Sequence, residues 1–198
     1  PQAVAAGLAS LAGTYPRDDI DAARAAFDYM QQRADAHATA DGEKLVDRAL
    51  VTAGIVAGLK LDPASIRGAL LAVLPAAKAF DAVDVASRFG DDVSGLVAGV
   101  ARMDSIRARR VGATQEERAA QSENLRKMLL AMVEDIRVVL IKLAERTQAL
   151  RHLMSGDETL RRQAAREVTD LFAPLANRLG VWQLKWELED LALRALEP

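Results

Sequence analysis

Three carboxylates near the end of the chain form the densest group of side chains that could bind a metal ion. Glu187, Glu189 and Asp190 supply oxygen ligands of the kind that Mg²⁺ accepts. On a helix, however, Lys185 lies four residues before Glu189, which is the spacing of a stabilising ion pair. Arg194 lies four residues after Asp190 in the same way. We therefore interpret this segment as a charged helical face rather than a metal site.

The other reactive side chains form no recognisable catalytic group. His37 and His152 lie on different predicted helices, whereas a stable metal site normally needs three or more grouped ligands. No serine lies in a G-x-S-x-G turn, and the 12 glycines form no phosphate-binding loop. From the residues alone, the sequence predicts a helical domain without a visible active site.

Two basic runs could bind phosphate groups, because the arginine fork matches phosphate oxygens. The first run is RARR at 107–110, and the second contains Arg161, Arg162 and Arg166. Acidic residues accompany both runs, so we interpret them as solvated charged faces. Phosphate binding by the second run stays as the alternative.

Two tryptophans mark one face of the last predicted helix. Trp182 and Trp186 are four residues apart, and this spacing indicates a buried or interface stripe rather than a platform for stacking bases. We expect Trp182, Trp186 and Leu188 to contact a neighbouring domain.

The composition favours a folded helical domain. Hydrophobic residues make up 51% of the 198 positions and charged residues 27%, so the chain can bury a sizeable core. The net charge of −2 gives no support for nucleic-acid or membrane-surface binding. The absence of cysteine excludes disulfides and thiolate metal sites and favours a cytoplasmic location. The chain begins without methionine and ends directly after a helix pattern, so we expect a piece of a longer protein.

Apolar residues recur with the period of an α-helix almost throughout, and they predict an all-α bundle of about ten helices. Asp62 followed by Pro63 predicts a helix start, and Gly90 predicts the end of a short helix. Together with the short helix that ends at Gly90, helices are expected near 18–38, 43–59, 63–77, 92–103, 118–133, 136–153, 158–177 and 181–196.

Several motifs resemble the RelA/SpoT homologue family of (p)ppGpp synthetases and hydrolases. They are ENLRKML at 123–129, DIRV at 135–138, APLANRLG at 173–180 and KWELEDL at 185–191. The segment LDPASIRGALL at 61–71 falls in the expected order as well. The resemblance covers residues 20–198 and is densest after Gln121.

The resemblance implies an N-terminal, all-helical hydrolase domain of the HD phosphohydrolase type, with a synthetase domain directly after it. In that family the hydrolase domain binds one Mn²⁺ through two histidines and two aspartates. The metal activates the water that removes the 3′-pyrophosphate of (p)ppGpp. The longer protein is accordingly expected to be a GTP pyrophosphokinase.

The catalytic positions of that family carry other residues in this chain. The first metal-binding histidine falls on Arg48, and the last metal-binding aspartate falls on Glu145. The histidine–aspartate pair, the pair that assists the water and the two residues that contact nucleotide fall on Ala72, Val73, Ala76, Ala77, Gln148 and Ala149. The resemblance therefore implies a hydrolase site that has lost its metal ligands.

We expect a degenerate hydrolase-like domain at 1–153 and, at 154–198, helices that lead to an absent synthetase domain. The domain would be catalytically inactive, would need no cofactor and would regulate that synthetase as its partner. Ribosome contact is expected only through regions outside this chain. In place of the metal, Arg48 is expected to pair with a carboxylate, plausibly Glu145.

Two alternatives stay open. In the first, the old cleft senses a guanine nucleotide, and Arg48, Lys142 and Arg146 contact its phosphates. In the second, the domain is an active Mn²⁺-dependent (p)ppGpp hydrolase with a rearranged metal site.

Overall fold

The computed structural model describes residues 14–107, 126, 129–130 and 135–197. This part of the chain is helical, as predicted, apart from loops and one isolated bridge between Ala38 and Lys44. The elements are α2 (Arg17–Ala34), α3 (Leu45–Gly58), α4 (Pro63–Leu71), α5 (Ala82–Phe89), α6 (Asp91–Arg107), α8 (Ile136–Leu153), α9 (Glu158–Glu167), a π-helical segment (Val168–Phe172), α10 (Ala173–Arg178) and α11 (Trp182–Leu196). Most of the helix predicted at 118–133, and most of the basic run at 107–110, lie outside the described residues.

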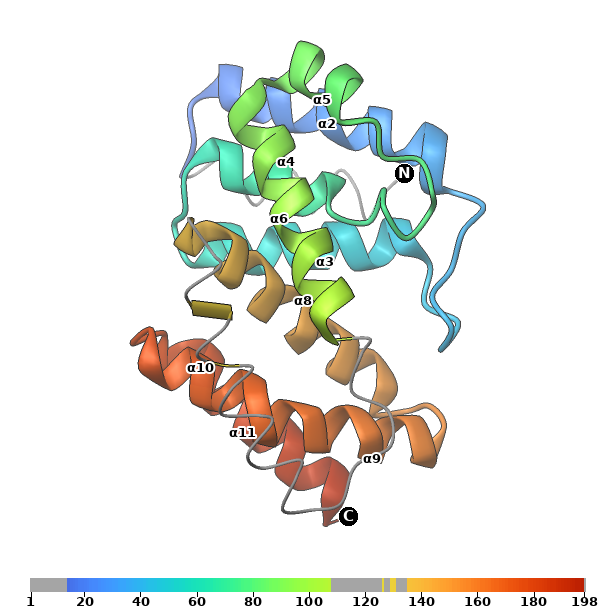
Figure 1. Ribbon diagram of the computed structural model, residues 1–198, viewed down its shortest axis with the longest axis vertical. Coiled ribbons are helices and arrows are strands. Elements are labelled where there is room, and N and C mark those ends of the chain that lie inside the picture. Colours follow the sequence, from blue (N-terminus) through green and yellow to red (C-terminus); the bar gives the residue numbers. More distant parts are fainter. Residues whose placement is uncertain (1–13, 108–125, 127–128, 131–134, 198) are drawn as a thin grey trace.

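Helix α8 lies between two groups of helices (Figure 1). It packs against α3 and α6 of the first group and against α9 and α11 of the second. Within the first group, α4 packs against α2, α3 and α6. Most residues of α8 are buried, and they include the charged Lys142 and Glu145. None of the helices among the described residues is long and apolar enough to span a membrane.

The predicted helix boundaries at Asp62 and Gly90 are confirmed. The Asp62 carboxylate accepts a hydrogen bond from the Ser65 N–H at 3.1 Å, and Pro63 occupies the first turn of α4. Gly90 ends α5 with a φ of 95°, which favours glycine. Asp135 begins α8 by accepting from the Arg137 N–H.

The prediction of one helix over 63–77 is wrong, because α4 ends at Leu71 and turns follow. Pro75 has no N–H to donate to the Leu71 carbonyl, so the helical ladder stops there. The Ala79 N–H instead donates to the Leu74 carbonyl at 2.9 Å, and Lys78 takes a left-handed φ of 56°.

The helix predicted over 158–177 is present, and it contains a π-helical turn. Pro174 cannot donate to the Asp170 carbonyl, and the Ala173 N–H reaches back to Val168 in a π-helical turn. The freed Asp170 carbonyl accepts from Arg126 Nη2 at 3.2 Å instead. With α9, the π-helical segment and α10 taken as one continuous helix, the described residues contain eight helices, fewer than the ten or so predicted.

Arg137 holds the first turns of several helices together. Its guanidinium contacts Asp62 at 2.7 Å, Asp92 at 2.5 Å and Asp135 at 2.5 Å, at the starts of α4, α6 and α8. The hydrogen bonds from this guanidinium hold the pKa of Asp135 below its usual value. These contacts hold the start of α8 against the starts of α4 and α6, and α8 carries the buried charges of Lys142 and Glu145.

Candidate functional site

Charged and polar side chains gather where α3, α6, α8 and the loop 35–44 meet; Glu43, Arg48, Lys142 and Glu145 are buried, and Asp104 at the edge is exposed. We call this group the buried charge cluster; its members are Asp41, Glu43, Arg48, Asp104, Lys142, Glu145, Arg146 and Gln148. Charged side chains are rarely buried unless they are paired, so the cluster is the feature of this fold that most needs a physical account.

Glu145 is the centre of the cluster. Its carboxylate contacts Arg48 Nη1 at 3.3 Å and Lys142 Nζ at 2.5 Å. It also accepts two hydrogen bonds from the guanidinium of Arg146. Burial acts to raise the pKa of Glu145, but Arg146 and Lys142 hold that pKa well below its ordinary value. The carboxyl group is therefore ionised in the folded protein.

Arg48 connects Glu145 to the loop. The predicted ion pair between Arg48 and Glu145 is confirmed, and two further carboxylates share the same guanidinium. Arg48 Nε donates to Glu43 at 2.6 Å, and Nη2 contacts Asp41 at 3.4 Å. The other oxygen of Glu43 accepts from Gln148 Nε2 at 2.6 Å. Residues on α3, α8 and the loop thus share one hydrogen-bonded network.

The side chains of the cluster do not fit a divalent metal ion. A guanidinium stands beside Glu145, where it would repel a cation, and the Glu145 oxygens are already used by positive groups. In the described part of the chain, no three His, Cys, Asp or Glu side chains gather as metal ligands would.

The remaining positions of the predicted site are mostly apolar and packed. Val73, Ala77 and Ala149 are buried, and Ala72 packs against the core from a half-buried position. These four side chains fill apolar packing positions. Ala76 differs from them, because Ala76 is exposed in the turns that follow α4.

Of the proposed nucleotide contacts, Arg48 and Lys142 are buried and Arg146 is half-buried, and all three are paired. Lys142 is 2% exposed, and its ammonium contacts both Asp104 and Glu145 at 2.5 Å. In this structure these cations are therefore not available to a phosphate group from solution.

The charged surface positions behave as the sequence indicates. Lys185 contacts Glu189 at 2.8 Å, and Arg194 contacts Asp190 at 3.3 Å, both at the i,i+4 spacing. The remaining carboxylate of this segment, Glu187, pairs with Arg151 across the α8–α11 contact. In the second basic run, Arg162 pairs with Glu158, Arg161 donates to a backbone carbonyl and Arg166 is exposed.

The predicted contact residues of α11 fall into two kinds. Trp182 and Trp186 are 53% and 65% exposed, so they are surface side chains and not part of the core. Leu188 is fully buried and has no surface to offer a neighbouring domain. The prediction is corrected for Leu188, because that side chain faces the other elements of this chain and belongs to the core.

The sequence reasoning missed Asp41, Glu43 and Asp104. Glu43 is 4% exposed, and a buried glutamate in a loop has no local signal in the sequence. The only indication was the Asp41-Gly42 pair, which marks a tight turn close to Arg48.

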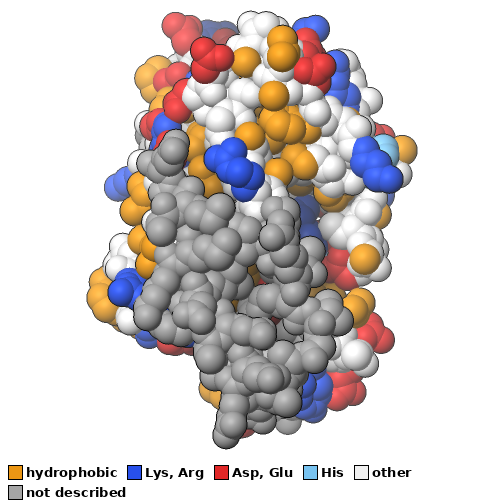
Figure 2. Space-filling view, in the orientation of Figure 1, with side chains coloured by type: hydrophobic (Ala, Val, Ile, Leu, Met, Phe, Trp, Pro, Cys, Tyr) orange, Lys and Arg blue, Asp and Glu red, His pale blue; other side chains and the backbone are white. Residues whose placement is uncertain are grey.

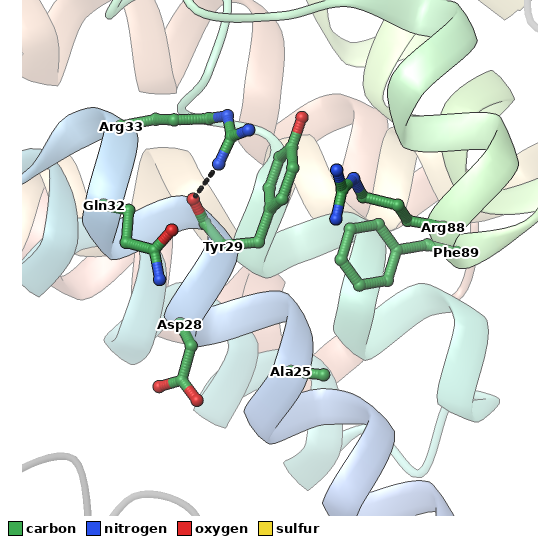
Figure 3. A pocket seen from close by; sticks show the side chains of 7 residues that line it. All are labelled: Ala25, Asp28, Tyr29, Gln32, Arg33, Arg88 and Phe89. Carbon is green, nitrogen blue, oxygen red and sulfur yellow. Dashed lines mark hydrogen bonds between the residues drawn. The ribbon is translucent and has the colours of Figure 1, made fainter.

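A second polar group joins α2 to α5. Figure 3 shows Arg33 and Arg88 on either side of the Tyr29 ring. The guanidinium carbons of Arg33 and Arg88 lie 3.6 and 5.5 Å from the ring centre. The Tyr29 hydroxyl donates to Asp84 at 2.6 Å, and Asp84 also pairs with both arginines. Phe89 contributes to an open hollow of about 570 Å³ beside them. Because Asp84 already balances both arginines, we interpret this group as a structural link between two helices.

One face of the molecule is shown in Figure 2, where acidic, basic and hydrophobic side chains are interspersed over the described part. On that part of the face, no broad basic surface of the kind that binds nucleic acid is present.

Comparison with known proteins identifies the class. The family model for the HD domain matches residues 26–182, so this chain is an HD domain. Within that class it belongs to the RelA/SpoT family, as its relatives show.

The relatives carry two kinds of name. The bifunctional (p)ppGpp synthase/hydrolase SpoT of Escherichia coli K12 is 38% identical over 192 residues, which cover 96% of this chain and 26% of the relative. GTP pyrophosphokinases of Myxococcus xanthus and E. coli K12 are 39% and 41% identical, covering 93% and 86% of this chain and 24% and 23% of the relatives. The chain thus spans about a quarter of the length of these curated relatives.

A solved structure has the same fold. It belongs to a metazoan ortholog of SpoT that hydrolyses ppGpp, and it superposes with a TM-score of 0.62 at 24% identity. The match covers 92% of this chain and 99% of that one. The likeness shows the fold, and the chemistry has to be argued from the residues of this chain.

Proposed function

We propose that this chain is a catalytically inactive HD domain that regulates an adjacent (p)ppGpp synthetase in a cytoplasmic GTP pyrophosphokinase of the RelA type. The protein would act in the stringent response. Residues 1–153 would form the degenerate hydrolase-like part, and residues 154–198 the link to the synthetase. Two observations support the proposal: relatives named GTP pyrophosphokinase, and the buried charge cluster at the predicted metal positions.

The observation that carries the proposal is the pairing of Arg48 with Glu145. Hydrolysis in this family is expected to need a metal-activated water, and a metal of that kind requires carboxylate or imidazole ligands with free electron pairs. Arg48 offers only donors, and the Glu145 carboxylate is occupied by Arg48, Lys142 and Arg146. A site with this charge arrangement favours an ion-paired interior over a bound metal.

The regulatory part of the proposal rests on α11. Trp182 and Trp186 leave more than half of their surface exposed, together with Leu193 at 58%. Tryptophan is enriched where proteins contact one another, because it combines a large apolar surface with a polar N–H. We propose that this face contacts the synthetase domain.

The catalytic test measures the release of pyrophosphate from ppGpp by this chain in the presence of Mn²⁺. The SpoT relative from E. coli serves as the positive control under the same conditions. We expect no release above the background of the buffer. Hydrolysis that depends on Mn²⁺ would overturn the proposal.

The regulatory test uses Trp186→Ala in the longer protein, with Arg194→Ala as a control from the same helix. Arg194 is exposed but lies on another face of α11 than Trp182, Trp186 and Leu193. We expect Trp186→Ala to change the rate of (p)ppGpp synthesis, and Arg194→Ala to leave that rate within experimental error. Equal synthesis rates for the two variants and the parent protein would rule out the proposed contact.

A further inference from the structure

The loop 35–44 is a compact turn with hydrogen bonds of its own. The Thr39 N–H donates to the Glu43 carbonyl at 2.8 Å, and the Gly42 N–H donates to the Thr39 carbonyl at 3.0 Å. The Leu45 N–H closes the base of the loop by donating to the His37 carbonyl at 3.0 Å. Gly42 supplies the φ of 87° that the turn requires. The loop therefore presents the Glu43 side chain from a defined scaffold.

Donors from two helices bind both carboxylate oxygens of Glu43. Arg48 Nε from α3 lies 2.6 Å from one oxygen, and Gln148 Nε2 from α8 lies 2.6 Å from the other. Glu43 is 4% exposed, so water competes little for these donors. A guanidinium and an amide placed in this way would bind the oxygens of a phosphate group equally well.

The loop also sets the charge of the cluster. Three cations, Arg48, Lys142 and Arg146, pair there with four carboxylates, and two of the carboxylates, Asp41 and Glu43, belong to the loop. If the loop swung away, the net charge at this place would rise by two units. A closed loop therefore makes the cleft unfavourable for an anion, and an open loop makes it favourable.

We propose that the loop 35–44 is a tethered lid, and that its Glu43 carboxylate occupies an anion site formed by Arg48 and Gln148. A pyrophosphate group competes with Glu43 for these donors. The lid deepens the proposed function. It rests on that function in one respect, because the site binds the pyrophosphate group without cleaving it. The apparent affinity is reduced by the fraction of molecules whose lid is open, so the closed lid masks the site.

The test is a calorimetric titration of this chain with inorganic pyrophosphate in metal-free buffer. We expect Glu43→Ala to bind pyrophosphate at least about tenfold more tightly than the parent chain, because the competing carboxylate is gone. Arg48→Met added to that variant should abolish the gain. Asp47→Ala is the matched control, because Asp47 is an exposed carboxylate next to Arg48 in the sequence. It should bind like the parent chain.

A second measurement covers the case in which Glu43→Ala does not fold. Glu43→Gln keeps the size of the side chain, and circular dichroism verifies the fold of each variant. In the parent chain, the amides of Thr39, Gly42 and Leu45 should exchange with solvent faster as pyrophosphate saturates the site.

The proposal is overturned if no folded variant binds pyrophosphate more tightly than the parent chain, or if Asp47→Ala gains as much as Glu43→Ala. It is also overturned if pyrophosphate leaves the exchange of the loop amides unchanged. A parallel ppGpp hydrolysis assay on the same samples tests the proposed function separately. Hydrolysis of ppGpp in that assay would overturn the proposed function, whereas the pyrophosphate-binding result alone tests the lid.

Discussion

Replacing Glu145 with glutamine keeps the shape of the side chain and removes its charge. Arg48, Lys142 and Arg146 then lose a shared partner inside the molecule, and Lys142 is only 2% exposed. Removing one partner of a buried ion pair costs about 3–5 kcal/mol, and here the three cations are left with fewer negative partners where water can hardly reach them. We therefore expect Glu145→Gln to lower the free energy of unfolding by about 3–5 kcal/mol.

The measurement is urea unfolding followed by circular dichroism, with a thermal melt beside it. For a chain of this length each kcal/mol shifts Tm by roughly 2–4 °C, so a fall of about 6–20 °C is expected. Glu189→Gln is the matched control, because Glu189 forms an i,i+4 ion pair with Lys185 at the surface. Exposed pairs of this kind contribute about 0.2–1 kcal/mol, so the control should change little.

The pH dependence checks the same reasoning independently. In the folded protein the pKa of Glu145 lies well below its ordinary value of 4.5, so folding favours the charged form. The stability from such a group is present above the unfolded pKa and is lost as the pH falls through the folded pKa. The difference between the parent chain and Glu145→Gln should be constant near neutral pH and shrink below about pH 4. A loss under about 1 kcal/mol at neutral pH, or a difference that grows in acid, would refute the argument.

Three further changes test the fold by urea unfolding. Lys78→Gly should raise the free energy of unfolding by about 0.5–1 kcal/mol, because Lys78 has a φ of 56°; a loss would contradict this. Gly99→Ala should lower it by about 1–3 kcal/mol, because the new Cβ would lie 2.6 Å from Val138 Cγ2; Val138→Ala in the same chain should recover part of the loss. Arg137→Met should lower it by about 1–2 kcal/mol at low salt and less at high salt, since its carboxylate partners are partly exposed; a loss independent of salt would contradict this.

Helix positions could be predicted from the sequence where the signal is local. Asp62 and Gly90 act through their own side-chain and backbone geometry, so the sequence predicts those boundaries well. Pro75 and Pro174 are equally local signals, but the apolar period continues through both of them. An interpretation by period alone therefore extends α4 beyond Leu71 and misses the π-helical turn before Pro174, since the missing proline N–H changes the hydrogen bonding and the period does not.

The centre of the site could be predicted only in part. The family resemblance places Arg48 and Glu145 at positions that share one metal, and this was sufficient to predict their ion pair. Glu43 could not be found in the same way, because the resemblance assigns no metal or catalytic position to it; its partners Arg48 and Gln148 lie 5 and 105 residues away in the sequence. Only the folded loop brings that carboxylate into the interior, and loop geometry of this kind has no periodic signal.

On the proposed function, the cluster explains how the domain keeps its shape without a metal. A metal ion in such a site would connect α3 to α8, and removing it alone would leave Glu145 paired only with Lys142 and Arg146 of its own helix. Arg48 supplies the missing positive charge from α3, and Glu43 balances the rest of that guanidinium from the loop. The connection between α3 and α8 is therefore retained by ion pairs. Because α8 also packs against α11, the helix with the exposed tryptophans stays attached to the helix that carries Lys142 and Glu145 of the buried charge cluster.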